Sequence, residues 1–229
     1  MGLYTSYVLP RLINCTMQNT LAAAERARCV PCASGTVLEV GIGSGLNIPW
    51  YSPDLDILVG LDPSVPLWQL GRQRSAAAPF PIAYIRGSGE HLPLEDQRFD
   101  TVVTTWTLCT IPDPVTALKE MRRVLKPDGH LIFIEHGLAP DRRVQAWQYR
   151  LNPLWHRLAG GCHLDRRIDT LIADAGFHIC QLDRGYGKGP KPFSFLYKGL
   201  AQPLANTARQ HATGQRTPQE QVPSLASRR

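Results

Sequence analysis

The residues of this chain best suited to chemistry lie in one short stretch near the N-terminal end. Gly41, Gly43 and Gly45 form a G-x-G-x-G turn after one apolar run, and Asp62 ends the next apolar run. Glycines at such a turn permit positive φ and let backbone N–H groups approach a ligand closely. A carboxylate at the end of the following strand can accept hydrogen bonds from both hydroxyls of a ribose. The stretch therefore predicts a site for a ligand that contains adenosine.

The details of the turn favour a ligand with an ammonium group over a dinucleotide. A dinucleotide fingerprint has glycine where this chain has Leu46, and a phosphate-binding loop has lysine after its glycines. The acid Glu39 lies two residues before the first glycine. S-adenosylmethionine (SAM) contains both adenosine and an ammonium group, so we expect SAM rather than NAD. A glycine turn that merely joins a strand to a helix is the alternative.

Alternating strands and helices would position these groups. Apolar periodicity predicts strands at 37–40, 57–61, 81–85, 100–105, 130–135, 177–183 and 193–200, and helices at 5–29, 47–51, 64–75, 113–125 and 165–175. Asp165 and Gly176 are the expected caps of the last helix. This order predicts an α/β fold with a seven-stranded, mostly parallel sheet and helices on both faces. Ligands of such sheets bind at the carboxyl ends of the strands.

An insertion at residues 141–163 follows the fifth predicted strand. Trp147, Trp155 and several leucines share one helical face, and Pro153 is expected to divide the segment into two helices, with Asn152 capping the second. We interpret the insertion as a lid over an apolar acceptor. Its Trp, Leu and Arg content also suits a membrane surface, reached through residues 141–159. A helix pair packed on the core is the remaining alternative.

Five segments in order resemble the motifs of class I SAM-dependent methyltransferases. They are LEVGIGSG at 38–45, GLDPS at 60–64, GSGEHLPL at 87–94, FDTVVTTWTLC at 99–109 and LKEMRRVLKPDGHLIFIEH at 118–136. The resemblance covers about residues 35–200 and implies the Rossmann-like class I methyltransferase fold. Leu108-Cys109, Glu135-His136, Gly161-Cys162 and the closing PFSFLYKGLAQP are more similar to small-thiol S-methyltransferases and their bacterial relatives than to phospholipid N-methyltransferases or ubiquinone/menaquinone C-methyltransferases.

The resemblance implies a set of residues that contact SAM. Glu39 would orient the glycine turn or meet the ammonium through water, and many relatives have Asp or Asn where this chain has Ser88. Glu90 has a simpler alternative as an acid at a helix start. The full implied set is Glu39, Gly41, Gly43, Ser44, Gly45, Asp62, Ser88, Gly89, Glu90 and Thr105.

The residues expected to contact the methyl acceptor centre on His136, at the carboxyl end of the fifth predicted strand. A neutral imidazole can take a proton from a thiol, and a free thiol is only a few per cent ionised near pH 7. Cys109, Cys162 and His163 are expected to line the same space, together with the lid residues Trp147 and Trp155. A purely structural role is the alternative for each of them.

These observations predict a SAM-dependent methyltransferase with a small-molecule acceptor, such as a thiol. A phospholipid amine or a quinone ring is the alternative acceptor. A protein that binds SAM without turnover is the alternative of another class, because the sequence shows no obvious catalytic triad or metal cluster. Methyl transfer itself requires neither of them. The oligomeric state is left open.

Composition and charge indicate the class of protein and the partners to expect. The 229 residues are 43% hydrophobic and 19% charged, which is ordinary for one globular domain. Three of the six net positive charges fall in residues 203–229, and no dense Lys/Arg run lies beside aromatic residues, so we expect no nucleic-acid partner. We expect a cap helix within 1–34, the methyltransferase domain at 35–202 with its lid, and a disordered basic tail at 203–229.

The cysteines indicate the compartment. Six cysteines without a recognisable signal peptide predict free thiols in the cytoplasm, with peripheral membrane contact as an addition. Cys29 and Cys32 form a lone C-x-x-C without a second pair, so we expect no metal site there. A redox pair is the alternative, although such a pair normally opens a helix and this segment leads into a predicted strand.

Overall fold

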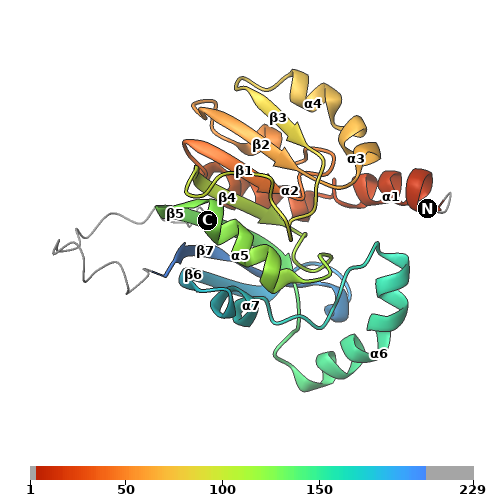
Figure 1. Ribbon diagram of the computed structural model, residues 1–229. Coiled ribbons are helices and arrows are strands. Elements are labelled where there is room, and N and C mark those ends of the chain that lie inside the picture. Colours follow the sequence, from red (N-terminus) through yellow and green to blue (C-terminus); the bar gives the residue numbers. More distant parts are fainter. Residues whose placement is uncertain (1–3, 205–229) are drawn as a thin grey trace.

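The computed structural model of the protein describes residues 4–204, and its centre is one seven-stranded sheet (Figure 1). The strands lie in the order β3-β2-β1-β4-β5-β7-β6. β7 runs antiparallel to both neighbours, whereas β1 to β5 pair in parallel. This arrangement confirms the predicted mostly parallel α/β sheet. The strands are β1 Thr36–Val40, β2 Ile57–Leu61, β3 Ile82–Ile85, β4 Phe99–Thr105, β5 Leu125–His136, β6 Phe177–Tyr186 and β7 Phe195–Pro203.

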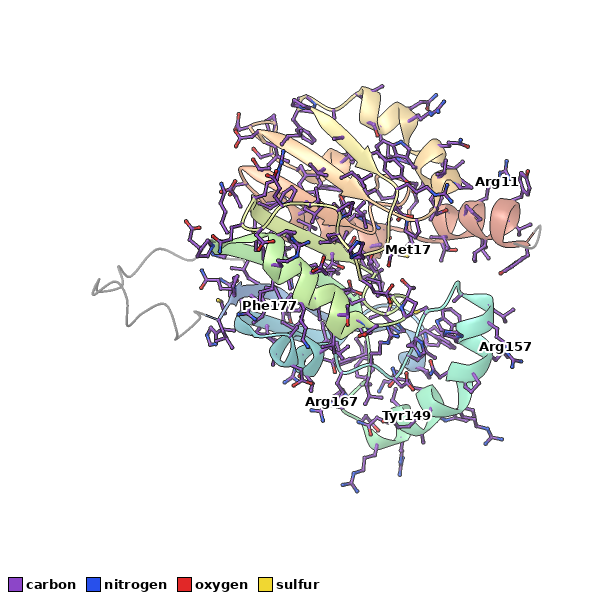
Figure 2. All side chains as sticks on the ribbon, viewed as in Figure 1. Arg11, Met17, Tyr149, Arg157, Arg167 and Phe177 are labelled. Atoms are coloured by element: carbon purple, nitrogen blue, oxygen red, sulfur yellow. The ribbon has the colours of Figure 1, made fainter. Side chains whose placement is uncertain are left out.

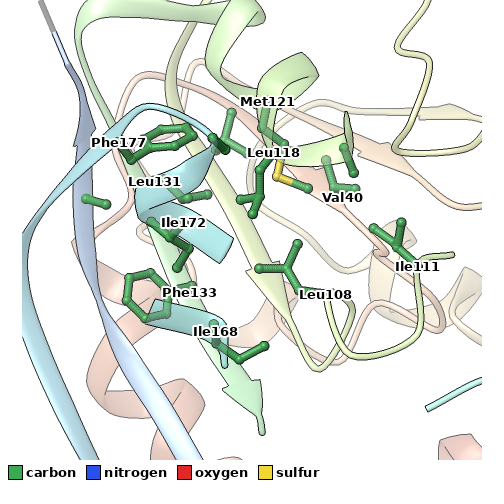
Figure 3. Close-up of a cluster of buried hydrophobic side chains, with 14 of the residues drawn as sticks. Val40, Leu108, Ile111, Leu118, Met121, Leu131, Phe133, Ile168, Ile172 and Phe177 are labelled. Atoms are coloured by element: carbon green, nitrogen blue, oxygen red, sulfur yellow. The ribbon is translucent and has the colours of Figure 1, made fainter. Parts of the chain in front are cut away.

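The helices cover both faces of this sheet, as predicted, because successive residues of the central strands point in opposite directions. Leu131 and Phe133 of β5 belong to a core that also contains residues of α5 and α7 (Figure 3). Ile132 and Ile134 belong to a second core beneath α2 and η3. The helices and turns are η1 Tyr4–Val8, α1 Leu9–Thr16, α2 Thr20–Cys29, η2 Val30–Cys32, η3 Ile48–Trp50, α3 Val65–Leu70, α4 Arg72–Ala76, α5 Pro114–Val124, α6 Arg142–Leu158, α7 Ile168–Asp174 and η4 Lys191–Phe193.

The predicted single helix at 5–29 is wrong, because the chain breaks at Asn19. This residue is extended, with φ −65° and ψ 156°, and its side chain accepts a hydrogen bond from the backbone N–H of Ala22 at 2.9 Å. An asparagine cap of this kind starts a new helix, and it separates α1 from α2. The predicted helix at 47–51 is only the short 3₁₀ turn η3.

Pro153 does not divide the insertion, and this prediction is also wrong. α6 continues through it from Arg142 to Leu158, with Pro153 on the exposed side, where water can satisfy the carbonyl that loses its N–H partner. Asn152 does not cap a second helix. Its side-chain oxygen instead accepts from the backbone N–H of Leu164 at 2.8 Å and so holds the loop after α6.

α7 begins later than predicted. Asp165 does not cap it, because the cap position is Arg167, which makes no side-chain capping bond. Asp165 lies instead 3.7 Å from Nδ1 of His163. Gly176 follows the helix end with φ +86°, as the prediction of a C-terminal glycine requires. The predicted tail lies outside the described residues apart from Pro203 and Leu204, which continue the end of β7. Among residues 4–204, no helix is long and apolar enough to cross a membrane.

The predicted helix at 64–75 is two helices, α3 and α4, separated by Gly71. A Cβ at Gly71 would lie 2.5 Å from the backbone oxygen of Ser44, so the helix junction packs directly on the glycine turn. We expect Gly71→Ala to lower the free energy of unfolding by about 1–3 kcal/mol, because backbone atoms cannot yield as a flexible side chain can. Urea unfolding measures this loss.

The matched control is Gly185→Ala in β6. A Cβ there meets no atom within 4 Å, and the residue is not among the glycines with positive φ. The control should unfold at the wild-type midpoint, and equal midpoints for both variants would contradict the close packing of Gly71 on Ser44.

Candidate functional site

The glycine turn after β1 and the end of β2 meet through Asp62. Its carboxylate is 6% exposed and accepts hydrogen bonds from the backbone N–H groups of Gly43 at 2.9 Å and Ser64 at 2.7 Å. Burial raises the pKa of Asp62, and these two N–H donors oppose that shift. A carboxylate can accept about four hydrogen bonds, so each oxygen retains capacity for a ligand.

The three glycines of the turn differ in what surrounds them. A Cβ at Gly41 would lie 2.1 Å from Thr107 Oγ1, and one at Gly45 would lie 2.6 Å from Ile48 Cδ1. At Gly43, with φ +52°, the nearest atom would be 3.9 Å away, and that atom is a carboxylate oxygen of Asp62. The middle of the turn is therefore less crowded than its two ends, and it lies beside an acceptor of hydrogen bonds. These residues fit the ribose and backbone-bound portions of SAM.

Glu39 organises the base of the turn. It is 1% exposed, and its two oxygens accept hydrogen bonds from Asn47 Nδ2 at 2.8 Å and from the Tyr51 hydroxyl at 2.9 Å. Asn47 Nδ2 also donates to Thr105 Oγ1 at 3.0 Å, and Asn47 Oδ1 accepts from Arg26 Nε at 2.9 Å. These bonds link the turn to the end of β4, which supports the orienting role for Glu39.

Sequence reasoning did not identify Arg26, Asn47 or Tyr51. The Arg26 guanidinium is buried, its pKa is lowered to about 10 by that burial, and it lies 4.8 Å from the ring of Trp106. Trp106 has φ +51°, which is unusual for a bulky residue and marks a strained position directly after β4. No local sequence pattern predicts these contacts, because Arg26 lies in α2, 21 residues before Asn47.

Burial raises the pKa of Glu39 to about 8 from 4.5. Between these values the folded protein holds a proton that the unfolded chain releases, so this carboxyl makes stability fall as pH rises from about 4.5 to about 8. We expect Glu39→Gln to flatten that fall, because the amide resembles the protonated carboxyl. Urea unfolding at about pH 5 and about pH 8 measures the slope.

The exposed Glu95 provides the control, since Glu95→Gln should leave the slope of the wild-type protein unchanged. Glu135 is retained in the variant and contributes a slope of the same sign, because burial raises its pKa to about 7. A Glu39→Gln protein with the full wild-type slope would show that Glu39 is ionised in the folded state.

The segment after β3 carries Ser88, Gly89 and Glu90. The Ser88 hydroxyl donates to Glu90 Oε2 at 2.6 Å, and Glu90 Oε1 accepts from the backbone N–H of Asp113 at 2.8 Å. Gly89 is buried, and a Cβ there would lie 3.0 Å from Val40 Cγ1. Glu90 therefore connects this segment to the residue that caps α5, whichever part it plays toward a ligand.

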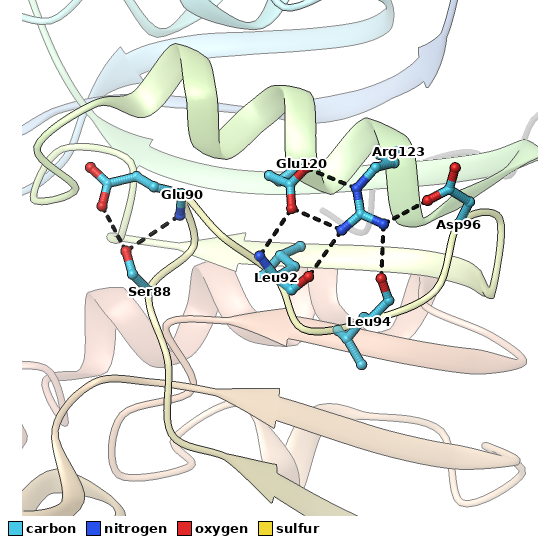
Figure 4. Close-up of polar contacts among 7 residues, drawn as sticks. All are labelled: Ser88, Glu90, Leu92, Leu94, Asp96, Glu120 and Arg123. Carbon is cyan, nitrogen blue, oxygen red and sulfur yellow. Dashed lines mark hydrogen bonds and ion pairs between the residues drawn. The ribbon is translucent and has the colours of Figure 1, made fainter.

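Arg123 of α5 fixes the rest of the same segment (Figure 4). Its guanidinium pairs with Glu120 and with Asp96, the latter at 2.6 Å. It also donates to the backbone oxygens of Leu94 at 2.8 Å and Leu92 at 3.0 Å. The loop that leads from Glu90 to β4 is thus tied to a helix of the core, which holds its beginning in place.

On the acceptor side, three elements bring together His136, Cys109 and Cys162. His136 is the last residue of β5 and is 6% exposed. Its Nδ1 lies 3.8 Å from Cys162 Sγ, while its Nε2 is buried without a hydrogen-bond partner among residues 4–204. The backbone oxygen of Cys109 accepts from the N–H of His163 at 2.8 Å, and the Cys109 thiol lies near enough to Cys162 for the two thiols to shift each other's pKa.

The two lid tryptophans lie in different places. The Trp155 ring packs on Phe193 at 4.7 Å, and the Trp155 indole lies near enough to Cys162 to lower the pKa of that thiol. Trp147 is 55% exposed and lies beside Arg150. The structure thus brings Trp155 to the acceptor group, and it places Trp147 on an outer surface.

Glu135 is a further buried group that sequence reasoning named only within a motif. One oxygen accepts from Thr104 Oγ1 at 3.0 Å and from the N–H of Thr107 at 3.1 Å, while Oε2 has no hydrogen-bond partner in the described part of the chain. In the sequence, the feature that could have identified Glu135 is a charged residue within an otherwise apolar run.

Within residues 4–204, no cluster of three or more His, Cys, Asp or Glu side chains could hold a metal ion.

A surface hollow of about 470 Å³ lies next to the end of β5 and the start of α6. It is lined by Leu138, Ala139, Pro140, Gln145, Arg167, Arg184, Phe195 and Tyr197. None of these is one of the individually predicted site residues, although Gln145 belongs to the insertion at 141–163.

Comparison with known proteins identifies the family of this chain. A family model described as a methyltransferase domain matches residues 38–133. The thiol S-methyltransferase TMT1B of Rattus norvegicus is 36% identical over 169 residues, which cover 72% of this chain and 67% of that protein. The phosphatidylethanolamine N-methyltransferase of Cereibacter sphaeroides is 28% identical over 149 residues, which cover 64% of this chain and 72% of that protein.

Solved structures show the same fold. A SAM-dependent methyltransferase from Thermotoga maritima superimposes with a TM-score of 0.60 and 21% sequence identity, covering 86% of this chain and 98% of that one.

Proposed function

The chain belongs to the SAM-dependent methyltransferases, and from that membership we propose that its acceptor is a small thiol. The observation that carries the proposal is the buried Nε2 of His136, which has no hydrogen-bond partner among residues 4–204 and could therefore receive a hydrogen bond from an acceptor S–H group. The likeness to a protein named as a thiol S-methyltransferase supports the same acceptor class. A lipid ammonium and a quinol ring also have to lose a proton, so the likeness to a thiol S-methyltransferase is what favours the thiol among these acceptors.

SAM, when bound, supplies an electrophilic methyl group on a sulfonium, whose departure needs no acid. Asp62 would hold the ribose hydroxyls, and the turn at 41–45 would surround the methionine portion with its backbone N–H groups. The remaining proposed contacts are Ser88, Gly89 and Glu90 beside the adenine and the Thr105 backbone beside the methionine group, with Glu39 orienting the turn.

His136 would take the acceptor proton at Nε2. Because a thiol is only a few per cent ionised near pH 7, a base at this position increases the fraction of attacking thiolate. Alignment of that sulfur with the methyl carbon would supply most of the remaining rate. We propose that the insertion at 141–163 acts as the lid that excludes water from this step, with Trp155 lining its inner side.

The test is incubation of the protein with methyl-labelled SAM, a small alkyl thiol and, in parallel, a total lipid extract. A phosphine keeps the cysteines reduced without itself offering a thiol. Label in a volatile thioether is the expected result. Label only in the lipid phase would replace the thiol by a lipid acceptor, and SAM binding without any transfer would favour a non-catalytic protein.

A second proposal concerns peripheral contact with a membrane. The Tyr4 hydroxyl donates to the backbone oxygen of Leu158 at 2.9 Å, so η1 and the end of α6 lie together. Figure 2 shows Arg11 and Arg157 on this same side of the molecule. The exposed apolar residues of η1 and the end of α6 are Tyr4, Tyr7, Val8, Leu154 and Leu158, and Leu12 of α1 and Trp147 and Tyr149 of α6 are exposed as well. Residues 142–164 include four arginines and no Asp or Glu, which suits an anionic surface.

We expect the protein to co-sediment with anionic phospholipid vesicles at low salt and to remain in solution with zwitterionic ones. Replacing Arg150 and Arg157 by Gln should weaken vesicle binding by about tenfold or more, since each basic residue contributes about 1 kcal/mol near such a surface. Absence of sedimentation with anionic vesicles at low salt would contradict the proposal.

A further inference from the structure

We propose that Cys162 is a positioning residue for His136. Its sulfur accepts the hydrogen of Nδ1–H, so that Nε2 keeps the lone pair that receives the acceptor proton. The inference rests on the proposed function, in which His136 is the base. It assigns to Cys162 the task that a carboxylate performs when it selects the tautomer of a catalytic imidazole.

The contact is built by backbone bonds on both sides of Cys162. The N–H of Gly161 donates to the His156 backbone oxygen at 2.9 Å, and the N–H of His163 donates to that of Cys109 at 2.8 Å. These bonds hold the loop after α6 to the end of that helix and to the loop after β4, and in this position Cys162 Sγ lies 3.8 Å from Nδ1 of His136. The sulfur thus faces one specific nitrogen of the ring.

The neighbouring thiol favours Cys162 as the hydrogen-bond acceptor of this cluster. Interaction with Cys109 lowers the pKa of Cys162, and burial opposes that change. The same interaction, together with burial, raises the pKa of Cys109. Glu135 and Arg166 are the other charged groups that act on this thiol pair, and Arg166 is anchored by the backbone oxygens of Leu108 and Ile111.

The burial of Nε2 decides between the two tautomers of the neutral ring. A hydrogen on Nε2 would be a buried donor without a partner, and such a group costs about 1–3 kcal/mol. A hydrogen on Nδ1 has the sulfur of Cys162 as its acceptor. Nε2 then presents its lone pair to the acceptor thiol. As the acceptor proton moves to Nε2, the imidazole gains one positive charge while the methyl donor loses one, and Cys162 stabilises the imidazolium.

The first test observes the tautomer directly in the wild-type protein without SAM. Nitrogen NMR of protein labelled with ¹⁵N-histidine distinguishes Nδ1–H from Nε2–H, and His136 is assigned by the signal that disappears in His136→Gln. We expect the Nδ1–H form. The Nε2–H form would overturn the role of Cys162, and this measurement needs no variant of Cys162 to fold.

The second test compares two acceptors in Cys162→Ala. With a small alkyl thiol, kcat should fall about 10–100-fold while KM for SAM is unchanged, as is usual when a partner that orients a histidine is removed. With an aryl thiol that is already ionised at the assay pH, kcat should stay within about threefold of wild type, because no proton has to be removed. Cys162→Asp should recover most of the activity toward the alkyl thiol.

The control is Cys180→Ala, a partly buried cysteine of β6 whose sulfur contacts Gln202. This variant should behave as wild type with both thiols. Equal loss with both acceptors in Cys162→Ala would make Cys162 merely structural and overturn the inference. A wild-type protein that methylates neither thiol would instead overturn the proposed function, so the two failures are distinguishable.

Discussion

The His136→Gln protein is expected to bind SAM with wild-type affinity and to methylate a small alkyl thiol about 10²–10⁴-fold more slowly. Glutamine fills a similar volume at the end of β5, but it cannot take a proton. The contacts assigned to SAM lie on other elements, the turn after β1 and the ends of β2 and β4, so cofactor affinity should not change. Calorimetric titration with SAM and a label-transfer assay measure the two quantities separately.

A matched control is His178→Gln, because His178 is an exposed histidine of β6. It should retain full turnover. Loss of SAM binding together with turnover in His136→Gln would indicate a structural role for His136. Turnover within about threefold of wild type would remove His136 from the chemistry, since general-base catalysis contributes at least about 10²-fold where it operates.

Asp62→Ala is expected to weaken SAM binding by about 10²–10⁴-fold. The carboxylate would hold two ribose hydroxyls, and hydrogen bonds to a charged group contribute about 1.5–3 kcal/mol each. The substitution also releases the N–H groups of Gly43 and Ser64, which Asp62 fixes at 2.9 and 2.7 Å. Titration calorimetry measures the affinity, and thermal unfolding verifies that the variant is folded.

Asp62→Asn should be intermediate, because the amide retains one oxygen acceptor and loses the charge. Asp128→Ala, at an exposed position of β5, is the control and should bind SAM as wild type does. An Asp62→Ala protein that is folded and binds SAM normally would assign the ribose to another residue.

The fold was predictable to a large extent because its signals are local. Most of the strands contain a run of apolar residues, and β2 ends at Leu61, as predicted, whereas β5 extends from Leu125 to His136, beyond the predicted 130–135. Helix breaks were less predictable. The break at Gly71 depends on its contact with Ser44, and the continuity of α6 through Pro153 depends on the exposure of that face. Neither environment is visible from neighbouring residues alone.

The candidate site divides in the same way. The proximity of the glycine turn and Asp62 could be predicted from the sequence. The turn follows β1, Asp62 directly follows β2, and adjacent parallel strands place their carboxyl ends together. The hydrogen bonds that link Arg26 and Asn47 to Glu39 could not be predicted in this way, since they depend on how α2 packs on the sheet.

The sequence by itself determined the chemistry available to this protein: a glycine turn with an acid at the next strand end, a histidine after β5 and thiols in the loops. Only the tertiary structure decided which of these groups touch. Cys162 meets His136, 26 residues away, because β5 ends where the loop after α6 returns to the sheet, while Trp147 of the same helix faces outward. Residue type and local periodicity are properties of neighbours along the chain, whereas the approach of distant side chains depends on strand order and on the paths of the connecting loops.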